Sequence, residues 1–238
     1  LYATLSGMSS LRELSTVMLA CEGRLSHLNL KGFPRRSTLS DANRKRSSEV
    51  FASIYYGLFN KYRKLLSDSS PISPPVRHLK IIDSTTISLF RDILKGAGRT
   101  PLNGKKKGGI KMHTVINALE DVPCLVRFTE SAAHDRPFLK EVRLEKGSFV
   151  VFDKAYNDYL LFEQWTNRGI FFVTRQKEHT VYEVFVEYMP GDDSPKGLIK
   201  DQRIGIFKNK RSIEIRRILW KDMESQKTYT FITNNFDL

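Results

Sequence analysis

The chain has 238 residues, of which 40% are hydrophobic, so it can bury a core in one large domain or in two smaller ones. Its 15 Phe and 9 Tyr exclude an intrinsically disordered protein, and no run of about 18 apolar residues occurs that would span a membrane. The 39 Lys and Arg exceed the 26 Asp and Glu and give a net charge of +13. A polyanion such as nucleic acid is therefore the expected partner.

The cysteines and the first residues indicate a cytoplasmic protein. Cys21 and Cys124 are isolated and lack the spacing of a metal site, so we predict two reduced thiols. The first ten residues contain no basic segment followed by a long apolar run, so we expect no signal peptide. A start upstream of Leu1 stays open, because the first residue is not Met.

The N-terminal third is expected to be helical. Apolar residues at helical spacing predict a helix over 9–20, and Gly32 and Pro34 then interrupt the chain. A second, longer amphipathic helix is predicted over 35–66, with an apolar stripe that we expect to be core. The stripe consists of Val50, Phe51, Ile54, Tyr55, Leu58, Phe59 and Tyr62.

Basic residues gather around the start of this second helix. They are Arg35, Arg36, Arg44, Lys45 and Arg46. A helix N-terminus with nearby Arg suits a phosphate group, which predicts DNA binding. A solvated charged face is an equally good interpretation of the same residues.

A Ser- and Pro-rich segment at 67–75 predicts a domain boundary. Strands are then expected at 79–83, 111–119, 124–128 and 148–152, with helices at 134–144 and 159–167. Five further strands are expected at 171–174, 180–188, 202–207, 213–220 and 228–233. The predicted domains are a helical part over 1–70, a first part of a core over 76–170 and a β-rich insertion over 171–238.

Two carboxylates each follow a buried apolar run. Asp83 comes after LKII and Asp153 after FVVF. Strand ends are rigid and can hold carboxylates close enough to share a pair of Mg²⁺ ions, which prefer oxygen ligands. We expect the two side chains on adjacent strands, about 4–7 Å apart. The alternative for each Asp, taken alone, is a turn or helix cap.

Five ordered segments carry a family resemblance. They read IDSTTISLF, GGIKMHTVIN, TESAAHDRPFL, VFDKAYNDY and YTFITNN, and the N-terminal RSTLSDANRKR is similar to the leading domain of one branch of the family. Together they resemble the bacterial insertion-sequence transposases of the IS-four type over nearly the whole chain.

The resemblance implies a fold and a reaction. The fold is an α/β ribonuclease-H-like mixed sheet with a β-rich insertion, preceded by a small helical domain. The first catalytic acid of that fold lies on the first strand and the second just after the fourth, which implies Asp83 and Asp153 as catalytic, metal-binding residues. The implied cofactor is Mg²⁺, for which Mn²⁺ substitutes.

The motif around the second acid departs slightly from the family. The family's Asp-Arg-Gly-Tyr is here Asp153-Lys154-Ala155-Tyr156, with Ala in place of Gly. The resemblance implies Lys154 and Tyr156 as near-site residues. It also favours His113 as a near-site residue, although a lone His in a strand is more typically a structural hydrogen-bonding group. His134 and Asp135 are expected to cap a helix or to support the site from behind.

The family's third acid is a Glu in a helical signature of Tyr, Arg, Glu and Lys after the TNN segment. No Glu between Ala155 and Leu238 has that surrounding pattern, and Glu163 is assigned to a solvated helix face. We therefore expect the chain by itself to be inactive or severely weakened.

A glycine-flanked basic loop precedes the second predicted strand. Its residues Lys105, Lys106 and Lys107, with Lys111, are predicted to hold the DNA backbone, and a solvated hairpin turn is the alternative. We expect these lysines to form one positive face with Arg35 and Arg36. The loop lacks the residue order of a Walker motif.

The expected function is that of a D-D-E transposase. It would bind double-stranded DNA, both element ends and target, and cut and join strands in the bacterial cytoplasm, associated with the nucleoid; a homodimer on DNA is compatible with this. The first alternative is a non-catalytic DNA-binding remnant of a transposase. The second is a nuclease of the same fold without strand transfer.

Overall fold

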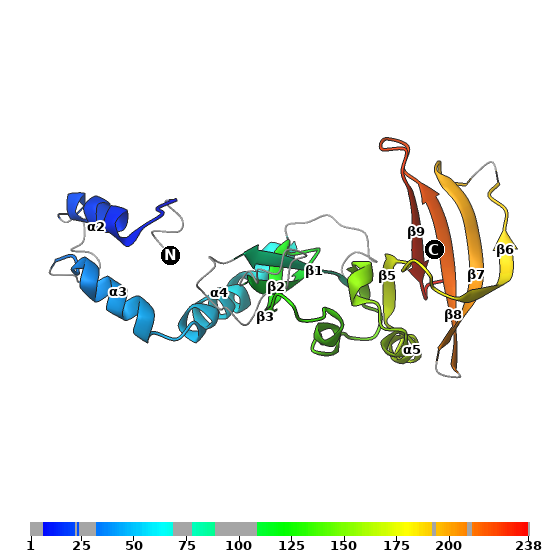
Figure 1. Cartoon of the computed structure of the whole chain (residues 1–238), viewed down its shortest axis with the longest axis horizontal. Coiled ribbons are helices and arrows are strands. Elements are labelled where there is room, and N and C mark those ends of the chain that lie inside the picture. The colour runs from blue at the N-terminus through cyan, green and yellow to red at the C-terminus, as the bar shows by residue number, and fades with distance from the viewer. Residues whose placement is uncertain are drawn as a thin grey trace, which may run out of the picture. The chain divides into compact units, whose positions relative to one another are not determined.

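The computed structural model describes residues 7–21, 23, 32–68, 78–88, 109–191, 194–208 and 211–237. The chain forms two compact units, Leu1–Tyr62 and Arg63–Leu238 (Figure 1). The predicted linker at 67–75 lies mostly outside the described residues.

The first unit is helical, as predicted. Its helix α2 spans Leu11–Ala20 and begins at Ser10, whose hydroxyl oxygen accepts a hydrogen bond from the backbone N–H of Glu13 at 3.1 Å. A Ser at this position satisfies one of the N–H groups that the first turn leaves without a helical partner.

The long helix predicted over 35–66 is wrong, because two helices occupy this segment. Helix α3 spans Arg36–Lys45 and α4 spans Glu49–Asp68. Arg46 between them is extended, and the hydroxyl oxygen of Ser47 accepts a hydrogen bond from the N–H of Glu49 at 3.2 Å. Serine side chains compete in this way with helical hydrogen bonds, so the Ser pair ends one helix and starts the next.

The apolar stripe of α4 does not form the predicted core. Phe51 and Leu58 are 52% and 53% exposed, and the rest of the stripe that the structure describes is similarly open. The periodicity correctly indicated a helix, but it did not indicate what the apolar face packs against. Among the described helices, none has the length and apolar character needed to cross a membrane.

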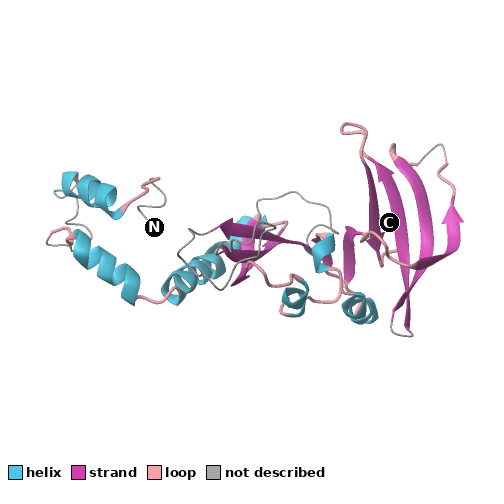
Figure 2. Ribbon diagram, in the orientation of Figure 1, coloured by secondary structure: helices cyan, strands magenta, loops and turns pink. Residues whose placement is uncertain are grey.

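The second unit contains a mixed sheet of nine strands (Figure 2). The strands are β1 Leu79–Ser88, β2 Gly109–Asn117, β3 Val122–Glu130, β4 Phe149–Phe152, β5 Phe171–Arg175, β6 Tyr182–Tyr188, β7 Leu198–Lys208, β8 Arg211–Lys221 and β9 Thr228–Thr233. They occur at the nine predicted places, with β1 and β7 longer than expected.

The helix predicted over 134–144 is wrong. Only a short 3-10 helix, η4, spans Arg136–Lys140, and it buries Phe138 and Leu139. The carbonyl of Leu144 accepts a hydrogen bond from the Arg168 guanidinium at 3.1 Å. The 3-10 turn is thus enough to bury Phe138 and Leu139, whose spacing had predicted a longer helix.

The strand order begins β3-β2-β1-β4-β5, in agreement with the ribonuclease-H-like mixed sheet that the family resemblance implied. Strand β2 is antiparallel to both of its neighbours, whereas β1, β4 and β5 run parallel. The expected β-rich block continues the same sheet, because β9 pairs with β5 and β8, β7 and β6 follow in order. The unit is thus a mixed α/β structure built on one large sheet.

An aromatic cluster forms the core beside β4 and β5. Helix α5, Tyr159–Asn167, follows the 3-10 turn η5, Lys154–Tyr156, and buries Phe162 and Trp165. Phe162 stacks on Phe172 at 4.1 Å between ring centroids, and Trp165 meets Phe152 edge-on at 5.9 Å. Aromatic pairs at such spacings add to the stabilisation from burial. This packing fixes the end of β4, where the second acid lies.

Asn234 of the TNN segment is a structural residue. Its amide donates hydrogen bonds to the Ile170 carbonyl at 2.8 Å and to the Thr166 hydroxyl at 2.9 Å, and its oxygen accepts from the N–H of Phe172 at 2.9 Å. The side chain therefore ties the end of β9 to the turn between α5 and β5.

Asn234→Ala should destabilise the second unit by about 2–4 kcal/mol, because unsatisfied buried backbone groups cost about 1–3 kcal/mol each. Urea denaturation followed by circular dichroism would measure the loss. Asn235→Ala is the matched control, since the Asn235 side-chain oxygen accepts a hydrogen bond from the N–H of Asp237, two residues away, at 3.0 Å. Equal losses for both variants would contradict the assignment.

Candidate active site

The two predicted acids lie beside each other on neighbouring parallel strands, Asp83 within β1 and Asp153 directly after β4. The last paired residues of β1 and β4 are Ile82 and Phe152, and Asp83 and Asp153 follow them by one position each. Neighbouring strands lie about 4.8 Å apart, so the backbones of the two acids are adjacent. This confirms the adjacent strands, but the strand end predicted at Asp83 is wrong, because β1 continues to Ser88 and Asp83 pairs with Thr114 of β2.

Both carboxylates lie on the same side of the sheet. Ile82 and Phe152 are 1% and 4% exposed, so their side chains point into the core. Successive side chains of a strand alternate between faces, which turns both acids to the opposite face. Accordingly Asp83 is exposed, and the Asp153 side chain is 37% exposed.

Arg175 extends this row to a third strand and was missed by the sequence reasoning. It follows Thr174, which pairs with Phe152, so it lies beside Asp153 at the end of β5. Its guanidinium donates a hydrogen bond to Asp153 Oδ2 at 2.5 Å. The signal was present in the sequence, since Arg175 ends the apolar run FFVT just as each Asp ends its own run.

The surroundings of Asp153 keep its carboxyl ionised. Burial acts to raise its pKa, but the hydrogen bond from Arg175, the N–H of Ala155 at 3.0 Å and the charge of Arg175 outweigh this effect. The pKa of Asp153 therefore lies below its ordinary value. Hydrogen bonds to the charged form favour that form.

The pair fits a hard divalent cation. Both groups are carboxylates, the ligands that Mg²⁺ prefers, and both reach solvent. Asp83 Oδ1 accepts a local hydrogen bond from the N–H of Ser84 at 2.7 Å. Within the described ranges, no group of three or more His, Cys, Asp or Glu residues is arranged to hold a metal. The structure thus supplies two acidic ligands here.

The three predicted near-site residues have different surroundings. His113 and Tyr156 are buried and in contact, with the Tyr156 hydroxyl 2.9 Å from His113 Nδ1. Lys154 lies at the surface, where its ammonium pairs with Glu178 Oε1 at 2.8 Å. His113 and Tyr156 therefore act from within the core, whereas Lys154 is open to solvent.

Lys111 corrects one prediction. Its side chain is only 7% exposed, and its ammonium donates to the Ala133 carbonyl and to Asp135 Oδ1, both at 2.9 Å. A buried ammonium with these partners is not offered to a DNA backbone, so we remove Lys111 from the DNA-binding set. The neighbouring residues Lys105, Lys106 and Lys107 lie outside the described residues.

The basic residues that the sequence analysis selected around α3 are all exposed. They are Arg35, Arg36, Arg44, Lys45 and Arg46. Arg35 precedes α3 and makes no side-chain cap, and Arg44 pairs with Asp41 at 2.9 Å. An exposed ion pair contributes little to stability, so its cation can exchange partners.

A small cleft opens beside the Asp153 turn. It has a volume of about 280 Å³ and is lined by His134, Arg136, Pro137, Ala155 and Lys177. Ala155 is the residue whose N–H binds the Asp153 carboxylate. Basic side chains thus lie next to the second acid, and the sequence reasoning had not selected Arg136 or Lys177.

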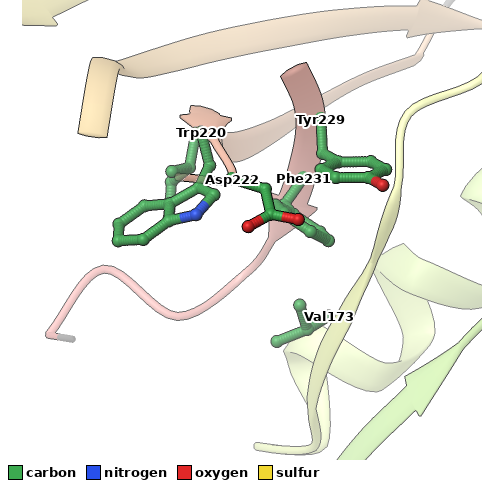
Figure 3. Close-up of a pocket in the computed structure, with 6 residues that line it drawn as sticks. Val173, Trp220, Asp222, Tyr229 and Phe231 are labelled. Carbon is green, nitrogen blue, oxygen red and sulfur yellow. The ribbon is translucent and has the colours of Figure 1, made fainter. Parts of the chain in front are cut away.

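A second hollow is apolar and lies on β5, β8 and β9 (Figure 3). Its volume is about 510 Å³, and it is lined by Val173, Ile218, Trp220, Asp222, Tyr229 and Phe231. The lining contains no cation, and the Asp222 carboxylate is engaged locally by the N–H of Glu224 at 3.1 Å. This surface does not suit phosphate, and none of the predicted site residues lines it.

Comparison with known proteins shows the family of this chain. The "Transposase DDE domain" family model matches residues 74–235, which contain both acids and the whole sheet. A protein of Sinorhizobium fredii named "Putative transposase y4zB" is 28% identical over 209 residues, which cover 85% of this chain and 55% of that protein. The chain therefore spans about half the length of this curated relative.

A solved structure of the piggyBac transposase synaptic complex with hairpin DNA is also similar. The likeness has a TM-score of 0.38 and 12% identity, and it covers 68% of this chain and 34% of that one. Since the family model covers more than half of the chain, together with the two acids described above, the chain belongs to the transposase DDE domain family.

Proposed function

We propose that the chain is the acid-bearing part of a DNA transposase of the IS-four type, in which Asp83 and Asp153 bind Mg²⁺ or Mn²⁺. The observation that carries the proposal is the pair of carboxylates that follow the last paired residues of the adjacent parallel strands β1 and β4, on one face of the sheet. Membership in the transposase DDE domain family supports it.

The protein's own residues prepare this site for a cation and a phosphodiester. A divalent cation bound there would supply charge stabilisation at the reacting phosphate. Asp153, like an ordinary Asp, is deprotonated at neutral pH, and its surroundings lower its pKa further, so no proton has to leave before a cation binds. Arg175 currently neutralises that carboxylate and is well placed to turn toward a phosphate oxygen instead.

Double-stranded DNA is the proposed substrate, and we assign its backbone to two basic surfaces. One is the exposed set around α3, Arg35, Arg36, Arg44, Lys45 and Arg46. The other is the cleft with Arg136 and Lys177, which opens beside the Asp153 turn. Assembly of a homodimer on DNA remains part of the same proposal.

Two acids are fewer than a pair of metal ions requires, so we propose that the 238 residues alone cleave DNA poorly. No third acidic group joins Asp83 and Asp153 in the part of the chain that the structure describes. If Asp83 and Asp153 do not bind metal, the lack of a third acid among the described residues favours the alternative, a non-catalytic DNA-binding remnant of a transposase.

Mn²⁺ binding tests the proposed function directly. Titration of the 238-residue chain, followed by electron paramagnetic resonance, should show a site that Asp83→Asn or Asp153→Asn weakens at least about tenfold, because each change removes a ligand charge. The control is Asp158→Asn, which removes a charge five positions from Asp153 yet keeps a good helix cap, since Asn caps as well as Asp. Binding that ignores both variants would reject the metal site and favour the remnant.

A further inference from the structure

A continuous chain of buried polar side chains lies beneath the two acids. Tyr156 and His113 are 1% and 0% exposed. The Tyr156 hydroxyl lies 2.9 Å from His113 Nδ1, and His113 Nε2 lies 2.9 Å from the hydroxyl of Thr129. The chain therefore joins the turn after β4 to β2 and β3.

The same chain reaches the strand that carries the first acid. Asp135 Oδ1 lies 3.7 Å from His113 Nδ1, and it also meets Ser84, which directly follows Asp83. The Ser84 hydroxyl donates to Asp135 Oδ1 at 3.4 Å, and Lys111 donates to the same oxygen at 2.9 Å. Tyr156 itself follows Asp153 by three residues, so this network connects the surroundings of both acids.

The protonation states of this network are well defined at neutral pH. Burial raises the pKa of Tyr156 to about 12, so its hydroxyl keeps its proton. Burial lowers the pKa of His113, and the charge of Lys111 acts in the same direction while Asp135 opposes it. The imidazole is therefore neutral, and its 3.7 Å approach to Asp135 is not a salt bridge. The charge of Asp135 is balanced by Lys111 instead.

Packing alone does not explain these polar groups. His113 stacks on Phe138 at 4.8 Å between centroids, and Tyr156 meets Phe152 edge-on at 6.5 Å, so the rings already fill the space. A Phe at position 156 would occupy the same volume without a hydroxyl to satisfy. Buried polar networks whose members all have partners favour one arrangement over others.

We propose that Tyr156, supported by His113 and Ser84, is a positioning residue that fixes the Asp153 turn against the Asp83 strand and so sets the separation of the two carboxylates. This inference rests on the proposed function, because it concerns the cation that the two acids would hold. Residues that orient metal ligands from behind typically change metal affinity about 10- to 100-fold when they are mutated.

Tyr156→Phe tests the proposal, because it removes the hydroxyl and keeps the ring. Mn²⁺ titration of the 238-residue chain should show affinity weakened about 10-fold or more. Tyr159→Phe is the matched control: Tyr159 is also buried and only three residues away, but its hydroxyl contacts Thr180 at 3.2 Å. The control should bind Mn²⁺ like the original chain.

Two further measurements keep the outcomes distinct. Thermal unfolding shows whether Tyr156→Phe folds. If it does not, Ser84→Ala removes the half-buried hydroxyl that joins the Asp83 strand to Asp135 of the same network, and it should weaken Mn²⁺ binding too. If Asp83→Asn weakens Mn²⁺ binding but folded Tyr156→Phe and Ser84→Ala leave it unchanged, the positioning role is wrong and the metal site stands. If Asp83→Asn and Asp153→Asn also have no effect, the proposed function fails first.

Discussion

DNA affinity of the chain should fall by about 10³–10⁵-fold between about 50 and 200 mM salt, the loss typical of a protein with several phosphate contacts. The reason is its net charge of +13 and the exposed basic residues of α3. Each Lys or Arg that meets a phosphate releases a condensed counterion, and added salt opposes that release. Fluorescence anisotropy with a labelled duplex at several salt concentrations measures the slope of log affinity against log salt.

Two double variants, each of which removes two positive charges, show which basic residues contact the DNA. The double variant Arg35→Gln with Arg36→Gln should reduce the salt slope by about 2, since each phosphate contact contributes about 0.9. The control removes two charges from the hairpin between β8 and β9, with Lys221→Gln and Lys227→Gln, and should leave the slope nearly unchanged. Equal slopes for both double variants would show that net charge, rather than the α3 surface, binds the DNA.

DNA cleavage should be negligible for the 238-residue chain and should appear when a third acid is supplied. We expect a fusion that adds a Glu-bearing helix after Leu238 to nick a duplex with Mg²⁺, and Asp83→Asn or Asp153→Asn in that fusion to reduce the rate by roughly 10³-fold. That factor corresponds to the loss of several kcal/mol of charge stabilisation at the phosphate, because about 1.4 kcal/mol is tenfold in rate. Single-turnover nicking of a labelled duplex measures the rates.

The control for cleavage is again Asp158→Asn, which changes the charge near the site but not a proposed ligand. It should cut like the fusion itself. If the 238-residue chain cuts as fast as the fusion, a carboxylate within these residues completes the site, and the assignment of only two acids is wrong.

The local sequence determined the strands and the two acids. Apolar runs such as LKII and FVVF need burial on the sheet, and the residue after each run lies where the pairing of β1 with β4 stops, so Asp83 and Asp153 could be placed on the strands before the fold was known. The polar residues after Asp83 hid the continuation of β1 to Ser88. Their order along the chain, together with the family resemblance, also predicted their adjacency, which the parallel pairing of β1 and β4 confirms.

Tertiary structure alone decided which polar groups are buried and what they contact. Lys111 lies in a basic segment, yet it faces Asp135 inside the fold, because alternation along β2 turns it inward and a residue 24 positions away meets it. The contacts of Arg175 with Asp153 and of Tyr156 with His113 likewise join residues 22 and 43 positions apart. Hydrophobic periodicity reports the burial of one segment at a time, whereas ion pairs and buried hydrogen bonds depend on which segments the sheet order brings together.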